Sequence, residues 1–411
     1  MKININVIGL GFVGLTTALG FCEKKFSVTF VENNKLKLNY IKKGKIPFQE
    51  PYLKNILKKY YKKKNVTFLT KPNILKNKIN VMFICVGTPS NKNGSINLGY
   101  VTKIIKELDK KINDERVLIV IKSTVLPGTI SKKLEKIIKK KNISICSNPE
   151  FLREGYAWND FIKTDKIVIG YKKEDDLKIL KKIYQNFNGD IIADSNDTAE
   201  FIKYLSNSLL ANLISFSNEL AIIGENNNNI NIKKSFNAVK LDKRWFGYPA
   251  MISSYLHPGL GFGGYCLPKD ISAMNFISKK TQIKNGMINS IQKTNKLIFK
   301  HQAKKVVKKF KKTDKIGILG VSFKAKSDDI RSSRSVELIK FLLEKGYKNL
   351  YTYDPLVKKS QLKKIQTKVI HSNILKKNTK IKYVLCTDWP EYLKFIKKNN
   401  DIDYIDLKYK V

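Results

Sequence analysis

Short apolar runs alternate with longer amphipathic stretches along the first part of the chain. The runs cover residues 3–9, 27–31, 66–69, 80–86, 117–121, 143–146 and 166–169. Strands that are apolar throughout and alternate with helices are typical of a mostly parallel sheet covered on both faces. This pattern therefore predicts a doubly wound α/β domain over residues 1–195.

The same alternation returns at the end of the chain, in apolar runs at residues 315–321, 349–354, 382–387 and 403–407. Between the two α/β patterns lies a helical pattern over residues 198–225, where Asp197 and Glu200 resemble a capping box at its start. A helix of this length often bridges two domains or forms a dimer seam. The predicted fold is α/β, with two Rossmann-like doubly wound domains, residues 1–195 and 301–411, joined by a long central helix within residues 196–300.

A glycine-rich loop follows the first predicted strand and opens a helix. It reads Gly9-Leu10-Gly11-Phe12-Val13-Gly14, and the second strand ends in Glu32. The glycines allow a tight turn, a close approach of a pyrophosphate and close helix packing, while the carboxylate can accept the hydroxyls of a ribose. Asn33 and Asn34 follow in place of an arginine for a 2′-phosphate. This pattern predicts NAD as the cofactor, although Lys35 weakens the argument against NADP.

The charge of the chain is extreme, because 79 basic and 34 acidic residues leave a formal net charge of +45 over 411 residues. Only five of the basic residues are arginines: Arg116, Arg153, Arg244, Arg331 and Arg334. The lysines spread over the whole chain, and base readout in nucleic acids relies on arginine forks. We therefore interpret the charge as compositional bias and expect no nucleic-acid partner. We expect no membrane insertion, since no apolar run reaches the length of a membrane span.

Five cysteines occur, an odd number with no CxxC pair. We expect neither a disulfide framework nor a metal site, and a reducing cytoplasm fits this usage. Cys266 differs from the others because it lies in a loop dense in glycine, between Gly259 and Asp270, with Lys269 beside it. A nearby cation lowers the pKa of a thiol, so Cys266 can be a covalent nucleophile. By spacing alone, a buried structural cysteine is an equal alternative.

Six segments, in order along the chain, together resemble the UDP-glucose/GDP-mannose dehydrogenase family. The loop Gly263-Gly264-Tyr265-Cys266-Leu267-Pro268-Lys269-Asp270 resembles its active-site signature GGxCxPKD. The others are residues 86–89, 122–129, 148–155, 320–331 and 353–355, which read VGTP, KSTVLPGT, NPEFLREG, GVSFKAKSDDIR and YDP. The resemblance runs from residue 3 to about residue 410. It implies that a sugar C6 alcohol is oxidised to a carboxylate with two NAD, through a thiohemiacetal and a thioester.

The resemblance also implies roles for individual residues. Cys266 matches the nucleophile, and Lys203 and Asn207, on one helix face, match the pair that stabilises the C6 oxygen. The set that handles the hydrolytic water and protons comprises Thr124, Glu150, Glu154 and Asp270. The set that would bind the cofactor comprises Gly9, Gly11, Phe12, Val13, Gly14, Glu32, Lys35, Thr88, Thr124, Glu154 and Arg331. The set that would bind the nucleotide sugar comprises Phe151, Leu152, Lys203, Asn207, Arg244, Gly263 and Lys324.

Arg244 resembles the family arginine that crosses a homodimer to the partner's substrate, with a surface arginine as the alternative. The wording of the cysteine loop and of residues 151–155 favours UDP-glucose over UDP-N-acetylmannosamine. UDP-N-acetylglucosamine and GDP-mannose remain alternatives. Two other functional classes are a two-electron hydroxyacid dehydrogenase and a non-catalytic nucleotide-sugar binder. Cys266, Lys203, Asn207 and Asp270 argue against both.

Overall fold

The computed structural model describes residues 2–48, 50, 52–89, 91, 95–153, 156–225, 227, 229–247, 259–264, 267–268, 271, 286–325, 327–362, 370–371, 375, 380–399 and 401–411. The chain forms two compact units, Met1–Ala211 and Asn212–Val411. Each is described below by itself.

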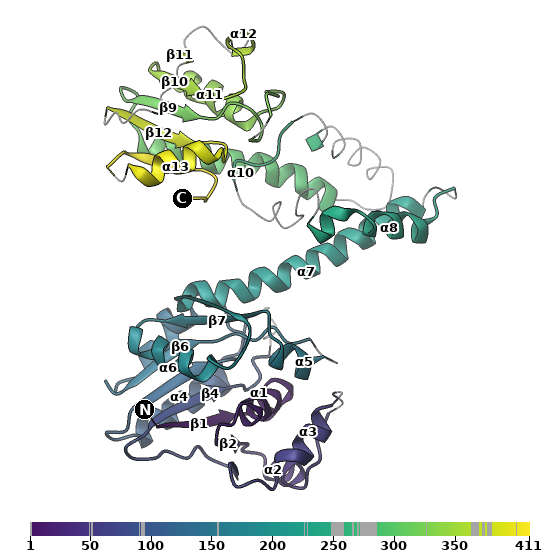
Figure 1. Ribbon diagram of the computed structural model, residues 1–411, viewed down its shortest axis with the longest axis vertical. Helices are drawn as coiled ribbons and strands as arrows, with labels where there is room; N and C mark the ends of the chain where they lie inside the picture. Colours follow the sequence, from purple (N-terminus) through teal and green to yellow (C-terminus); the bar gives the residue numbers. More distant parts are fainter. Residues whose placement is uncertain are drawn as a thin grey trace. The chain divides into compact units, whose positions relative to one another are not determined.

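The first unit is built on a sheet with strand order β3-β2-β1-β4-β5-β6-β7-β8 (Figure 1). Its strands are β1 (Ile3–Ile8), β2 (Val28–Val31), β3 (Val66–Leu69), β4 (Ile79–Ile84), β5 (Val117–Ile121), β6 (Ile143–Ser147), β7 (Lys166–Tyr171) and β8 (Asp190–Ser195). Neighbouring strands run parallel except β6 and β7. The order reverses between β1 and β4, which is where doubly wound sheets bind ligands.

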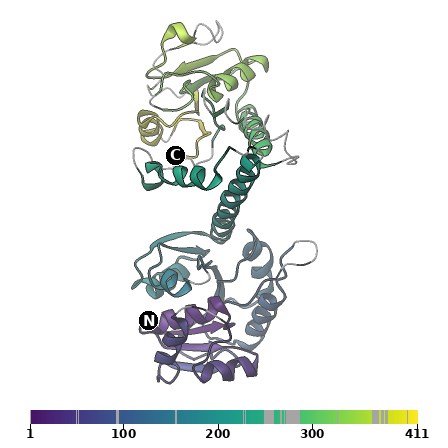
Figure 2. The same ribbon diagram turned by 90° about the vertical axis from the view of Figure 1, so that its right-hand side faces the viewer.

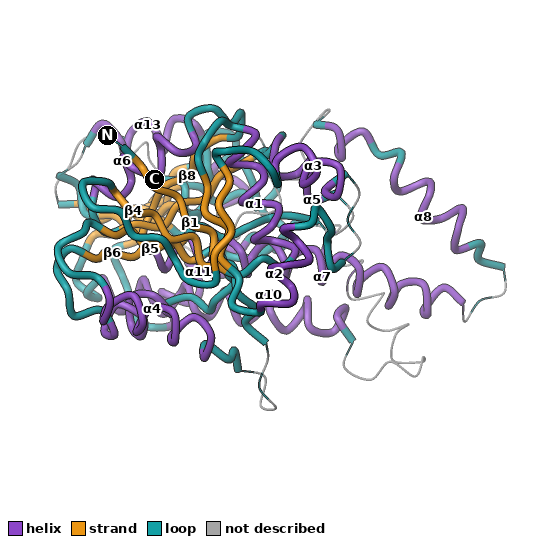
Figure 3. Tube along the Cα trace, turned by 90° about the horizontal axis from the view of Figure 1, so that it is seen from below, coloured by secondary structure: helices purple, strands orange, loops and turns teal. Residues whose placement is uncertain are grey.

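Helices cover both faces of this sheet, as Figure 3 shows for α1 and α4. Alternate residues of β5 face opposite cores, with Leu118 and Val120 on one side and Ile119 and Ile121 on the other. Every position of β5 is therefore apolar, whereas β1 and β4 also carry the buried polar side chains of Asn4, Asn6 and Asn80. The helices are α1 (Phe12–Glu23), α2 (Lys35–Lys42), α3 (Leu53–Tyr60), α4 (Gly99–Lys111), α5 (Ala157–Ile162) and α6 (Glu174–Tyr184), with a π-helical turn η1 (Ile130–Leu134) and a 3-10 turn η2 (Glu135–Ile137).

The long helix α7 spans Asn196–Glu225 and is continuous (Figure 2). The predicted capping box at its start is wrong. Ser195 Oγ accepts the Thr198 N–H at 3.2 Å and so caps the first turn. Asp197 instead accepts the Ser131 hydroxyl, and Glu200 accepts backbone N–H groups of residues 129 and 130. Both carboxylates therefore dock the start of α7 onto the first unit.

The second unit contains a smaller parallel sheet with order β11-β10-β9-β12-β13. Its strands are β9 (Lys315–Leu319), β10 (Leu350–Tyr353), β11 (Ile370–His371), β12 (Ile381–Leu385) and β13 (Tyr404–Asp406). The described helices are α8 (Ile232–Lys240), η3 (Lys243–Phe246), α10 (Met287–Lys309), α11 (Arg334–Glu344), α12 (Lys359–Leu362) and α13 (Pro390–Lys398). Both α10 and α11 pack on one face, and α13 packs on the other.

The expected α/β architecture with two Rossmann-like sheets and a long helix between them is confirmed. The three-part division at residues 195 and 300 stays a prediction, and residue 300 lies inside α10. Among the residues that the structure describes, no helix combines the length and the apolar character that crossing a membrane requires.

Candidate active site

The glycine loop after β1 has the geometry that a dinucleotide needs. A Cβ on Gly14 would lie 1.8 Å from the carbonyl oxygen of Gly9, so only glycine lets α1 pack this closely on the turn. A Cβ on Gly11 would meet no atom within 4 Å, so this side of the backbone is open. Phe12 and Val13 begin α1, where backbone N–H groups have no partner within the helix and attract phosphate. The residues present therefore fit NAD.

Glu32 lies just beyond β2 and is buried. Its carboxylate accepts the N–H groups of Leu10 and Asn34, each at 3.2 Å, and pairs with Lys37 Nζ at 2.7 Å. It thus ties the second strand to the glycine loop. Lys35 is exposed at the start of α2. The sequence analysis did not identify Lys37 as the partner of Glu32. The signal for it was its place on the helix that follows Glu32.

Two threonines meet where β4 and β5 end side by side in the sheet. The Thr88 hydroxyl donates to the backbone oxygen of Thr124 at 2.9 Å. Ser123 Oγ donates to the Val86 oxygen at 2.6 Å, which is a second bond between the segments that follow β4 and β5. The segments VGTP and KSTVLPGT are therefore held together at the carboxyl edge of the sheet.

The structure brings Glu150 and Lys203 together from a loop and from α7. Lys203 Nζ lies 3.1 Å from Glu150 Oε1, and the side chains are 7% and 14% exposed. Glu150 Oε2 accepts the Leu152 N–H at 2.6 Å. The Lys203 ammonium also lies 5.2 Å from the centre of the Phe151 ring. Asn207, one helical turn further along α7, is exposed.

A second lysine, Lys122, lies buried behind this pair and was also missed. Its Nζ donates to Asn148 Oδ1 at 3.0 Å, and the Tyr184 hydroxyl donates to the same oxygen at 2.5 Å. Burial lowers the pKa of Lys122 to about 8. A cavity of about 40 Å³ is lined by these three side chains and by residues 149–152, among others. In a chain with so many lysines, nothing in the sequence distinguishes this one.

Most candidate residues of the second unit lie in the cysteine loop or in the segment between β9 and α11. Of the cysteine loop, residues 259–264 and 267–268 are described, whereas Cys266 and Asp270 lie outside the described residues, as does Glu154 of the first unit. The Phe262 N–H donates to Asn295 Oδ1 at 2.8 Å, and a Cβ on Gly263 would lie 2.3 Å from the Ser332 oxygen. The stretch that leads to Cys266 is therefore fixed onto α10 and onto the residues before α11.

Three cations of the second unit were also predicted to bind ligands. Lys324 is exposed, with its Nζ 5.4 Å from the Phe323 ring centre. Arg331 pairs with Asp329 at 2.8 Å, and the hydrogen bond from Arg331 lowers the pKa of that carboxyl. Arg244 lies in η3 and pairs with Asp242, whose pKa it lowers to about 2. The side chains of all three cations are exposed or half exposed.

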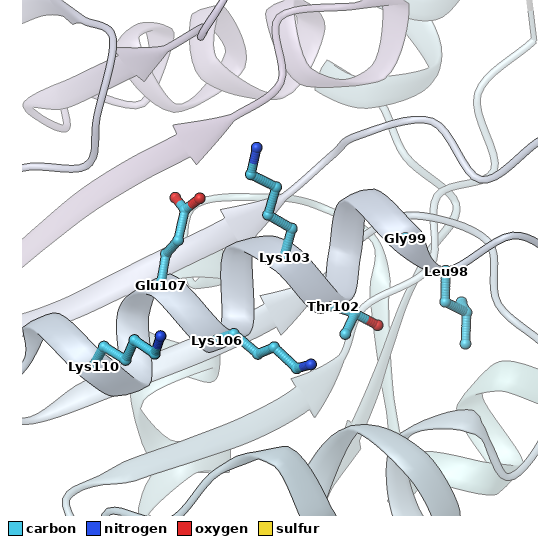
Figure 4. A pocket seen from close by; sticks show the side chains of 7 residues that line it. All are labelled: Leu98, Gly99, Thr102, Lys103, Lys106, Glu107 and Lys110. Carbon is cyan, nitrogen blue, oxygen red and sulfur yellow. The ribbon is translucent and has the colours of Figure 1, made fainter.

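Another pocket, of about 410 Å³, lies along α4 in the first unit. Its lining holds none of the predicted site residues. Figure 4 shows Lys103 and Glu107 extending to one side of the helix and Lys106 to the other, so the lysine amines do not converge. In the described part of the chain, no three His, Cys, Asp or Glu side chains are grouped so as to hold a metal ion.

Comparison with known proteins agrees with this geometry. Three family models match consecutive parts of the chain. These are the NAD binding domain of the UDP-glucose/GDP-mannose dehydrogenase family at residues 3–188, its central domain at 197–297 and its UDP binding domain at 317–406.

Individual relatives cover nearly the whole chain. A UDP-glucose 6-dehydrogenase of Rickettsia bellii is 34% identical over 404 residues, or 95% of this chain and 90% of that protein. A GDP-mannose 6-dehydrogenase of Pseudomonas aeruginosa is 32% identical over 90% of this chain and 85% of its own length. The crystal structure of a ternary complex of GDP-mannose dehydrogenase from Pseudomonas aeruginosa matches with a TM-score of 0.82 and 28% identity, over 99% of this chain and 96% of that one. The chain therefore belongs to the UDP-glucose/GDP-mannose dehydrogenase family and is an NAD-dependent nucleotide-sugar 6-dehydrogenase.

Proposed function

We propose that this enzyme oxidises the C6 alcohol of UDP-glucose to the carboxylate of UDP-glucuronate, in two oxidations joined by a covalent intermediate on Cys266. The observation that carries the proposal is the Glu150–Lys203 pair, which places a carboxylate and a cation 3.1 Å apart and largely out of solvent. An oxidation that passes through an oxyanion and ends in hydrolysis needs both groups. Relatives such as the Rickettsia bellii protein carry the name UDP-glucose 6-dehydrogenase.

In the first half of the reaction, the alcohol loses a proton and a hydride and becomes an aldehyde. Lys203 and Asn207 would stabilise the negative charge that develops on the C6 oxygen. NAD, bound at the loop of Gly9, Gly11 and Gly14, supplies the hydride acceptor in both oxidations. The thiolate of Cys266 then adds to the aldehyde carbon, which gives a thiohemiacetal.

In the second half, the thiohemiacetal loses a second hydride and a proton and becomes a thioester. Water attacks the thioester carbon, the carbon–sulfur bond breaks, and the carboxylate leaves with Cys266 restored. Glu150 would take the proton of that water, and Thr124 and Asp270 would order it, with Glu154 in the same proton-handling set. The sum is one alcohol and one water converted, with four electrons removed.

The remaining predicted residues would hold the ligands. Arg331, Glu32, Lys35, Thr88, Phe12 and Val13 would contact NAD. The nucleotide sugar would be held by Phe151, Leu152, Gly263, Lys324 and Arg244. Cations at exposed positions suit the diphosphates of both ligands.

We further infer a homodimer in a reducing cytoplasm. Four apolar side chains of α7 are about half exposed in the single chain: Phe201, Leu205, Leu210 and Leu213. Several exposed apolar side chains on one helix are typical of an interaction surface. The four cysteines that the structure describes are buried and free, which suits a reducing compartment.

The decisive measurement is the amount of NADH formed per nucleotide sugar. UDP-glucose, UDP-N-acetylmannosamine and GDP-mannose are compared in parallel for the wild type, Cys266→Ala and the control Cys22→Ala, which removes a buried thiol of α1. We expect two NADH per UDP-glucose in the wild type and the control, and none beyond the first oxidation in Cys266→Ala. One NADH per UDP-glucose in the wild type, or two NADH per UDP-glucose in Cys266→Ala, would exclude the thioester route. Two NADH from another sugar would keep the chemistry and change the substrate.

A further inference from the structure

Glu200 is a buried carboxylate on α7 that no step above uses. It is 2% exposed, and it lies one helical turn before Lys203. Its two oxygens face a loop some 70 residues earlier in the chain. Oε2 accepts the Thr129 N–H at 3.1 Å, and Oε1 accepts the Ile130 N–H at 3.0 Å. A buried carboxylate that satisfies two backbone donors connects the two segments firmly.

The loop that Glu200 holds is the one that carries Thr124. At its near end, Ser123 and Thr124 are anchored to the residues after β4 through the Val86 oxygen and the Thr88 hydroxyl. At its far end, Thr129 donates to Leu126 to close a turn, and the π-helical η1 begins at Ile130. A π-helical turn is rare and is frequently retained at functional sites. Glu200 is therefore the buried anchor of the far end.

The same part of α7 is fixed to other site segments. Asn196 accepts the Ser147 N–H at 2.8 Å, just before the segment of Glu150. Lys203 itself pairs with Glu150. The first two turns of α7 thus set the positions of Lys203, Glu150 and the Thr124 loop relative to one another.

We propose that Glu200 is a positioning residue of the dehydrogenase reaction, which holds the loop carrying Thr124 on the helix carrying Lys203. Its part in catalysis rests on the proposed function, whereas its part in holding the loop does not. Removing it takes away the carboxylate acceptor of the Ile130 N–H, leaves the Thr129 N–H with the Leu126 oxygen alone, and frees the far end of the loop. A misplacement of about 1 Å near reacting groups costs up to roughly 100-fold in rate.

The contact of Glu200 with the N–H groups of residues 129 and 130, which we call the clamp, has a pH dependence with a defined sign. Burial raises the pKa of Glu200 to about 7, and Asp197 adds to the rise, while the N–H groups of residues 128–130 act against it. Tyr204, on the same helix, also lies in its electrostatic range. Because an opened loop would return Glu200 to its ordinary, lower pKa, protonation favours the closed form. This contribution to the clamp is therefore full below the ordinary pKa of 4.5, and it is lost as the pH rises through 7.

The test compares three variants with two readouts. Glu200→Ala removes both acceptors, Glu200→Gln keeps one acceptor and the shape, and Ser131→Ala removes the exposed bond to Asp197 between the same segments. Turnover is measured with UDP-glucose and NAD, and hydrogen exchange is measured on peptides covering residues 128–131. We expect Glu200→Ala to lower kcat about tenfold with KM nearly unchanged, and to speed the exchange. In Glu200→Gln, kcat and the exchange rate should lie close to those of the wild type. Ser131→Ala should alter neither of them.

Several results would overturn the proposal. One is a kcat of Glu200→Ala within twofold of the wild type, and another is a loss of kcat with no change in exchange at 128–131. If Glu200→Ala does not fold, the pH dependence decides. After correction for intrinsic rates, exchange in the wild type should rise between pH 6 and pH 8, and in Glu200→Gln it should not. Equal protection at both pH values in the wild type would contradict the clamp. A finding of one NADH per sugar would overturn the thioester route and leave the exchange result standing.

Discussion

At the scale of single residues, Lys122 is a buried cation whose polar contacts come from Asn148. Its folded pKa of about 8 lies below the ordinary value of 10.5, so folding disfavours its charge. The cost is greatest below pH 8 and disappears as the pH rises toward 10.5. We expect Lys122→Met to raise the free energy of unfolding at pH 7 by about 1–3 kcal/mol, because Met fills similar space without charge. Asn148 Oδ1 would keep its bond from Tyr184.

Chemical denaturation at pH 7 and pH 10 measures this difference. The gain should shrink at pH 10, where the unfolded chain also begins to lose the lysine proton. Lys64→Met is the matched control, because Lys64 is exposed and this substitution removes the same unit of charge. A Lys122→Met protein that is less stable than the wild type at pH 7 would show that the hydrogen bonds of Lys122 outweigh its desolvation. The charge also lies within electrostatic range of Glu150 and Lys203, which gives a reason to retain it in spite of its cost.

At the scale of elements, the turn between β1 and α1 separates the needs of the fold from those of the cofactor. Gly14→Ala would push a methyl group against the Gly9 oxygen, and we expect it to lower the free energy of unfolding by on the order of 2 kcal/mol or more. Gly11→Ala meets open space at a φ of −73°, so its stability should stay within about 0.5 kcal/mol of the wild type.

Binding of NAD should show the opposite order. The methyl group of Gly11→Ala would occupy the space through which a pyrophosphate approaches the backbone. We expect its dissociation constant for NAD, measured by calorimetry, to rise about tenfold, or ~1.4 kcal/mol. Unchanged NAD affinity in a stable Gly11→Ala protein would mean that the dinucleotide does not pass this side of the loop.

The hydrophobic pattern predicted the central elements well because the buried parallel strands are mostly apolar. It missed β8 and β11. Strand β8 (Asp190–Ser195) is mostly exposed and carries polar residues at both ends, so its sequence lacks a strand period. Strand β11 is two residues long. The capping box was misread because Asp197 and Glu200 bond to a loop distant in sequence, which local spacing does not encode.

The candidate site was predictable to a different degree. The glycine loop and Glu32 follow from spacing, since one turn places them together. The meeting of Glu150 and Lys203 required the family resemblance, because a lysine on a helix in this chain is ordinarily a solvated side chain. Lys122 and Glu200 carry no sequence signal, since only the tertiary packing makes their charges buried.

At the scale of the whole molecule, the net charge of +45 is the most conspicuous property and yet the least tied to the site. The proposed site uses two of the five arginines, Arg244 and Arg331, and the buried Lys203, whereas lysines are spread along the whole chain. An assembly of two chains has to tolerate that charge. A seam formed by α7 suits this need, because the exposed side chains that we assign to it, Phe201, Leu205, Leu210 and Leu213, are apolar.

A mixing experiment tests whether Arg244 acts across such a dimer. Measured by the formation of the carboxylate product, Arg244→Ala and Cys266→Ala should each be nearly inactive alone. If Arg244 serves the partner's site, a hybrid dimer has one complete site, formed by Cys266 of one chain and Arg244 of the other. Co-expression in equal amounts should then restore about a quarter of the wild-type activity, since about half of the dimers are hybrids with one of two sites intact.

The same measurement has a clear opposing outcome. If Arg244 serves its own chain, each site of the hybrid lacks one of the two residues, and mixing restores no activity. The control is a mixture of Cys266→Ala with Cys266→Ala,Arg244→Ala, in which no arrangement completes a site. Sedimentation of the mixture verifies that hybrids form. The Arg244–Asp242 pair lies at η3 and the Arg244 side chain is half exposed, so we expect Arg244→Ala to disturb the fold little. Restored activity therefore reports on the position of the guanidinium across the dimer.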